Sequence, residues 1–172
     1  MTLALATVLA ASLIGAVCDV RTRRVPNILV GALLVCGLVE NFALSGWKGA
    51  GIDLAVTAAI LLAGTVAFSF KLIGGGDVKL LAAAAGTLGY PAAAPFVLLT
   101  LICGGIVGLA YAAVRGRLQA TYANMQAVTL PMLSGVAPVR PVNGLAMPYA
   151  VSIFAGALCT AALSAAHVRL LP

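Results

Sequence analysis

Long apolar runs, separated by short polar segments, make up most of this chain. The runs are apolar on every face and rich in Ala, Leu and Gly, whereas membrane β-barrel strands alternate polar and apolar residues. This pattern predicts an all-α protein that crosses a membrane. We expect a bundle of six transmembrane helices, at about residues 2–18, 28–45, 52–72, 78–90, 94–114 and 146–166.

Helix-breaking residues support these boundaries. Pro26 cannot continue a helix from upstream, and Asn27 is a suitable N-cap for the next one. Residues 46–48 form a short predicted loop whose tryptophan suits the membrane interface. Tyr90-Pro91 ends the fourth, short helix.

Composition agrees with a membrane protein. Of 172 residues, 63% are hydrophobic and 8% are charged, against about 25% charged in soluble domains. We therefore expect residues 1–172 to form one polytopic domain. The first run resembles a signal peptide, but it lacks a basic start and is followed by acidic and basic residues, so we expect an uncleaved helix.

The basic residues lie between the apolar runs, which indicates membrane topology rather than nucleic-acid binding. Eight would face one side, namely Arg21, Arg23, Arg24, Lys71, Lys79, Arg115, Arg117 and Arg140, against Lys48 and Arg169 on the other. The positive-inside rule then places both termini outside, on the periplasmic side, and residues 115–145 in the cytoplasm. That segment is either an ordinary loop or partly an amphipathic surface helix, since Leu118, Tyr122, Met125 and Met132 recur at helical spacing.

The stretch from Gly74 to Lys79 carries the first candidate chemistry, since three glycines precede Asp77 there. An acid beside a membrane span is costly and usually functional. Asp19 follows one predicted crossing and Asp77 follows three, so both lie on the cytoplasmic face. Glu40 and Asp53 fall toward the outer face.

Two carboxylates at one depth are the minimum requirement of aspartic proteolysis. Close together they share one proton, so that the ionised member accepts a proton from water while the other polarises the scissile carbonyl. Gly74, Gly75 and Gly76 would let an extended substrate backbone approach. We expect no metal or other cofactor, and we interpret the four cysteines as small buried hydrophobes.

Simpler interpretations stay open at this stage. Asp77 is equally suited to cap its helix, Asp19 to balance neighbouring arginines in a solvated loop, and the glycines to form a tight turn. Glu40 keeps open a small transporter or proton relay. A non-catalytic subunit of a membrane assembly is a further alternative.

The motifs resemble those of type IV prepilin peptidases, which are intramembrane-type aspartic proteases. The segment 19–27 has the family's aspartate, spaced arginines and an ending in Pro26-Asn27. The segment 74–82 matches its Gly-x-Gly-Asp motif with a trailing lysine, Lys79. Pro148-Tyr149-Ala150 matches a weaker third signature.

The resemblance implies that Asp19 and Asp77 are catalytic and that a basic leader is removed from prepilin or pseudopilin precursors at the cytoplasmic face of the bacterial inner membrane. Many members carry an N-terminal region with paired cysteines and also methylate their product. Without that region we expect no methyl transfer, and the compact form resembles the short peptidases of Flp-type tight-adherence pili. Archaeal preflagellin peptidases fit less well. Membrane lipid is the other expected partner, with Arg21, Arg23 and Arg24 on its headgroups.

Overall fold

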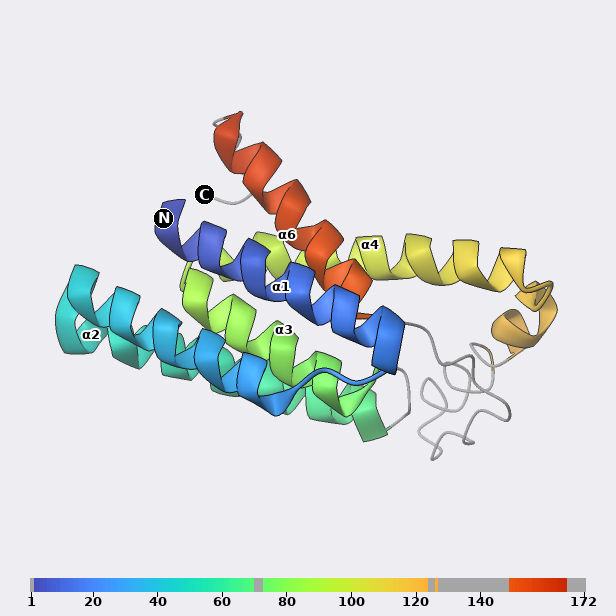
Figure 1. Ribbon diagram of the computed structural model, residues 1–172, viewed down its shortest axis with the longest axis horizontal. Helices are drawn as coiled ribbons and strands as arrows, with labels where there is room; N and C mark the ends of the chain where they lie inside the picture. The colour runs from blue at the N-terminus through green and yellow to red at the C-terminus, as the bar shows by residue number, and fades with distance from the viewer. Residues whose placement is uncertain (1, 70–72, 124–125, 127–148, 167–172) are drawn as a thin grey trace.

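The computed structural model describes residues 2–69, 73–123, 126 and 149–166, and these residues contain helices but no β-strand. In chain order the helices are α1 (Thr2–Thr22), α2 (Asn27–Ser69), α3 (Gly75–Leu88), α4 (Ala93–Val114) and α6 (Ala150–Ala165). They pack as one bundle, in which the start of α1 and the end of α6 lie at the same end (Figure 1). The predicted all-α class is confirmed.

Among the described residues, three helices are long and apolar enough to cross a membrane, namely α1 from Leu3, α2 and α4. The apolar helix α6 is shorter, with 16 residues, and α3 has 14. The chain is thus a helical membrane protein. Six crossings and the outward termini remain predictions.

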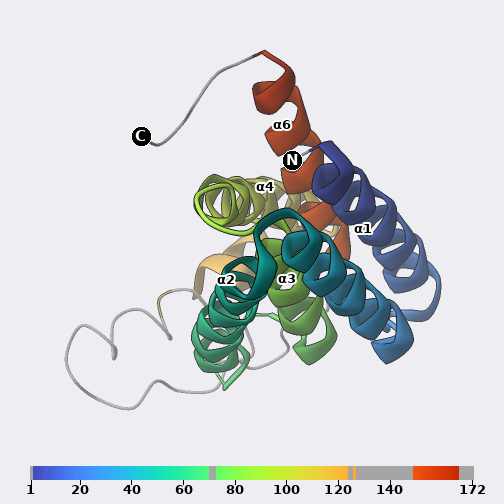
Figure 2. The same cartoon turned by 90° about the vertical axis from the view of Figure 1, so that its left-hand side faces the viewer.

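α2 is a hairpin, because its helical course breaks at Gly46. This residue has φ 60° and ψ −149°, a conformation that is essentially confined to glycine. The chain reverses there, so that residues 27–45 and 47–69 form two arms (Figures 1 and 2). The predicted loop at residues 46–48 is therefore longer than the observed break, since the helix resumes at residue 47.

α3 is the central helix. Apart from Lys79, every residue from Asp77 to Leu88 is buried. Both arms of α2 pack on it through small residues, since Gly37 in the first arm meets Thr87 and Gly64 in the second arm meets the Val78 side chain. A side chain at either glycine would collide with α3, so these glycines permit close helix packing.

The remaining helices cover the other sides of α3. α1 lies against α2, α3 and α6, while α4 packs mainly against α6. α3 ends at Leu88, and its C-cap is Gly89, which has φ 64°. The Tyr90–Pro91 peptide follows, so the predicted break is confirmed. α1 and α3 are in contact, with Asp19 near the end of α1 and Asp77 near the start of α3.

Two helix ends differ from the predictions in a way that concerns the site. α1 continues to Thr22 instead of ending near residue 18, so Asp19 belongs to its last turns rather than to a loop. α3 begins at Gly75, with Gly74 as its N-cap, so Asp77 is its third residue. Several residues named in the sequence analysis lie outside the described residues, namely Lys71, Arg140, Pro148, Arg169 and most of segment 115–145.

Candidate functional site

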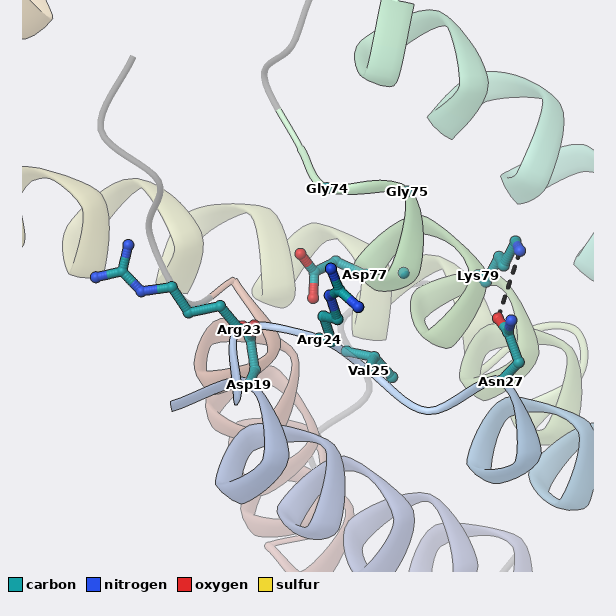
Figure 3. A pocket seen from close by; sticks show the side chains of 10 residues that line it. Asp19, Arg23, Arg24, Val25, Asn27, Gly74, Gly75, Asp77 and Lys79 are labelled. Carbon is teal, nitrogen blue, oxygen red and sulfur yellow. Dashed lines mark hydrogen bonds between the residues drawn. The ribbon is translucent and has the colours of Figure 1, made fainter. Parts of the chain in front are cut away.

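One cavity collects most of the residues that the sequence singled out. Its volume is about 300 Å³ (Figure 3). Its lining comes from the end of α1, the following connection, and the starts of α2 and α3: Asp19, Arg23, Arg24, Val25, Asn27, Gly74, Gly75, Gly76, Asp77 and Lys79. The two aspartates, distant in sequence, thus line one cavity, although the sequence left open whether they lie close together.

Asp19 is a buried helical residue, and only 6% of it is exposed. One carboxylate oxygen, Oδ2, accepts a hydrogen bond of 3.2 Å from the backbone N–H of Ala150, the first residue of α6. The interpretation of Asp19 as a solvated loop residue is therefore wrong. Its burial comes from packing against α6, which no local sequence signal announces.

Asp77 is equally buried, at 7% exposed. Its Oδ1 has no hydrogen-bond partner among the described residues, and it forms no capping bond at the start of α3. Burial and then the negative charge of Asp19 raise the pKa of Asp77 to about 7. The interpretation of Asp77 as an N-cap is therefore wrong, because Gly74 occupies that position.

The three glycines are required by contacts rather than by backbone angles, because none of them has a positive φ. A Cβ at Gly74 would lie 2.7 Å from Oδ2 of Asp77, and one at Gly76 would lie 3.3 Å from Cβ of Val25. Gly75 faces the ring of Phe68 at a comparable 3.3 Å. The tight-turn interpretation is insufficient, since these glycines make room for the carboxylate and for the connection after α1.

Lys79 and Asn27 link the starts of α3 and α2 at the exposed rim. The Lys79 Nζ donates to Oδ1 of Asn27 at 3.5 Å (Figure 3). The Asn27 side chain thus faces Lys79, and the residue itself is the first of α2 rather than a cap outside it. Pro26 precedes it, and its carbonyl accepts from the N–H of Leu29 in the first turn.

Arg23 and Arg24 also line the cavity, whereas Arg21 does not. Arg23 has φ 52°, an uncommon conformation for a residue other than glycine. It ends the helical course of α1 and directs the connection past the two aspartates. Sequence reasoning assigned these arginines to lipid and topology, or to balancing Asp19 in a solvated loop, and did not predict that Arg23 and Arg24 would line a cavity with both acids.

The other two acids lie toward the opposite end of the bundle. Asp53 is 1% exposed in the second arm of α2, where its Oδ1 accepts from the Thr57 hydroxyl at 3.3 Å beside Gly86. Gly86 lies nine residues beyond Asp77, about 14 Å along α3. The predicted separation into two pairs of acids therefore has a structural counterpart. Within the described ranges, no three His, Cys, Asp or Glu side chains gather as a metal site requires.

The fold and the site together describe a helical membrane protein in which two buried carboxylates share one cavity. A model of the type IV leader peptidase family matches residues 6–109, which include both aspartates and the cavity lining. The chain therefore belongs to this family and has a type IV leader peptidase-like function. Comparison with curated proteins and with solved structures found no significant match.

Proposed function

We propose that this protein is an aspartic endopeptidase in which Asp19 and Asp77 together activate water. The observation that carries the proposal is the burial of both carboxyl groups at one cavity, with the pKa of Asp77 raised to about 7. A pair that shares one proton near neutral pH contains both the base and the acid that peptide hydrolysis needs. The exposed rim, which includes Arg24, admits water from outside the bundle.

The proposed reaction is hydrolysis of the peptide bond that follows the leader. The ionised carboxylate accepts a proton from water as the water oxygen bonds to the scissile carbonyl carbon, and the protonated carboxyl donates to the carbonyl oxygen. The carbon–nitrogen bond then breaks as the carboxyl group that took the water proton donates it to the leaving nitrogen, and the other aspartate regains its proton from the tetrahedral hydroxyl as the carbonyl reforms. An extended substrate would pass along the cavity wall to which Gly74, Gly75 and Gly76 contribute, within reach of the pair.

The proposed substrates are prepilin or pseudopilin precursors of Flp-type pili, cleaved at the cytoplasmic face of the bacterial inner membrane. The family supports a leader-bearing substrate, and the surplus of basic residues on one side supports the cytoplasmic face. Arg21 lies outside the cavity and is exposed, so it is the arginine best suited to lipid headgroups.

The proton-relay alternative is less well supported. Between Asp77 and Thr87, α3 presents only Lys79 as a polar side chain, and Lys79 is exposed at the rim. The buried remainder is Val, Leu, Ala and Gly, which cannot carry protons toward Asp53. The two groups of acids are thus separated by an apolar stretch of the central helix.

Separate Asp19→Asn and Asp77→Asn variants test the proposal, with processing of a co-expressed cognate prepilin as the readout. Each should lower the cleavage rate by about 10²- to 10⁴-fold, with normal membrane insertion. Asp53→Asn is the matched control, because it is a buried acid in the same bundle that does not line the cavity. If either active-site variant cleaves at the parental rate, the catalytic pair is wrongly assigned. A loss of function in Asp53→Asn alone would favour the relay.

A further inference from the structure

The start of α6 reaches the aspartates although it lies outside the segment that matches the family, residues 6–109. α6 begins at Ala150, which is fully buried, with Tyr149 as its N-cap. α1 and α6 pack against each other, so that this helix start meets the end of α1 that carries Asp19. α6 is therefore a structural component of the cavity's surroundings.

The hydrogen bond from Ala150 distinguishes Asp19 from Asp77. As the first helical residue, Ala150 has an N–H with no acceptor inside its own helix, and it donates to Oδ2 of Asp19 at 3.2 Å. A hydrogen bond donated to a carboxylate favours its ionised form, and the positive end of the helix dipole acts in the same direction. Asp77 has no equivalent donor on its Oδ1 among the described residues.

Tyr149 anchors this helix start between the pair and α4. Its hydroxyl and ring occupy the space that Gly104 leaves free, since a Cβ at Gly104 would lie 2.8 Å from the hydroxyl oxygen. Burial is the larger cause of the raised pKa of this phenol, and the negative charge of Asp77 is the second. The titratable and charged groups around Asp19 are therefore Asp77 and Tyr149, with Arg23, Arg24 and Lys79 on the cavity lining.

We infer that the first turn of α6 sets the polarity of the catalytic pair: the Ala150 N–H holds Asp19 as the carboxylate that accepts the proton of water, and Asp77 carries the proton that goes to the scissile carbonyl. The inference rests on the proposed function and assigns the roles within it. Ala150 and Tyr149 are positioning residues, because they act through the aspartates. The raised pKa of Asp77 agrees with this order.

The direct test replaces Ala150 by L-lactic acid in the full-length protein, which turns one amide into an ester and removes only the N–H. The acid limb of the pH–rate profile should move upward by about one pH unit. The rate on that limb should fall about tenfold while KM stays within about twofold. Lactic acid at Ala155, inside the same helix, is the matched control and should leave the acid limb in place. An unchanged acid limb at position 150 overturns the inference.

A second measurement needs no backbone change. The infrared band of protonated carboxyl groups is compared in the parent, Asp19→Asn and Asp77→Asn at weakly acidic pH. The inference expects the band to decrease in Asp77→Asn and to persist in Asp19→Asn, and the reverse result overturns it. The proposed function fails separately, namely if either asparagine variant still cleaves prepilin at the parental rate.

Discussion

Asp77 has a buried carboxyl group whose pKa is raised to about 7, so its charge changes near neutral pH. Burial is the larger cause and the neighbouring charge of Asp19 the smaller one. Both disfavour the ionised form, so the proton stays on at weakly acidic pH and leaves as the pH rises through about 7. At the scale of single residues, three predictions follow from this environment and from the glycine beside it.

The first concerns the rate. If Asp77 must be protonated to donate to the carbonyl, cleavage should decrease as the pH rises through about 7. Initial rates of prepilin processing by the purified protein in lipid, measured from weakly acidic to weakly alkaline pH, check this. A rate that stays constant across neutrality would contradict the assignment of Asp77 as the acid.

The second concerns stability. The pKa of Asp77 in the folded protein, about 7, exceeds the ordinary value of 3.8 for an aspartate in the unfolded chain. Between these two pH values the unfolded chain releases a proton that the folded protein retains. The contribution of Asp77 to the free energy of unfolding is therefore fully present below pH about 3.8 and is lost as the pH rises through about 7. Asp77→Asn removes this loss and should stabilise the protein at neutral pH and above by up to a few kcal/mol. Thermal unfolding in detergent at acidic and alkaline pH measures it, and a gain independent of pH would count against the raised pKa.

The third concerns Gly74. An added Cβ would lie 2.7 Å from Oδ2 of Asp77, so Gly74→Ala must displace the carboxylate. We expect kcat to fall about tenfold or more while the fold persists, because small misplacements of reacting groups cost rate. Gly31→Ala is the control, since Gly31 has nothing within 4 Å of its Cβ position. Equal rates in the parent and Gly74→Ala would show that the carboxylate tolerates the displacement.

At the scale of helices, the packing of α3 inside the α2 hairpin determines where Asp77 lies. Gly86 contacts Asp53 and Thr57 of the second arm so closely that no side chain fits between them. Small residues allow helix axes to approach each other closely, which explains why α3 is rich in Ala and Gly. The position of the acid therefore depends on residues far along the same helix.

Gly86→Leu tests this dependence. The added side chain should destabilise the protein by about 1–3 kcal/mol and reduce cleavage through displacement of α3. Thermal unfolding and processing are measured together, with Gly51→Leu as control, because Gly51 lies in the same hairpin with nothing within 4 Å of its Cβ position. A Gly86→Leu protein with parental stability would contradict the packing argument.

At the scale of the whole molecule, short helices limit how the bundle meets the membrane. α3 has 14 residues, about 21 Å, against a hydrocarbon core of about 30 Å. Although α3 is short, its polar backbone is covered by α1, α2 and α6 rather than exposed to lipid. We expect the cavity at its start to lie near the headgroup level, where water reaches it from one side.

Labelling of single cysteines tests the orientation, in a variant without the four native cysteines. Trp47→Cys, at the exposed turn of the α2 hairpin, should react with an impermeant reagent added outside. Leu118→Cys, exposed beyond α4, should react only after the membrane is opened. The opposite result would invert the predicted topology and place the aspartate cavity on the outer face.

The sequence by itself determined the features that local physics controls. Apolar runs and breakers such as Tyr90-Pro91 predicted the helices, because helix formation and termination depend on neighbouring residues. The motifs around Asp19 and Asp77 pointed to the family, which the family match confirms, while the common membrane face inferred from counting crossings stays a prediction. The exact helix ends were less predictable, since whether α1 stops near residue 18 or continues to Thr22 depends on what packs around its last turns.

Only the tertiary structure decided the electrostatics of the pair. The burial of Asp19 and its hydrogen bond from Ala150 arise where α1, α3 and α6 meet, and so does the position of Asp77 Oδ1, which has no partner in the part of the chain that the structure describes. Helices distant in the chain make these contacts, and no local pattern encodes them. For the same reason the glycines before Asp77 predicted a close approach, but the carboxylate and Val25 as its partners emerged only once the helices were assembled.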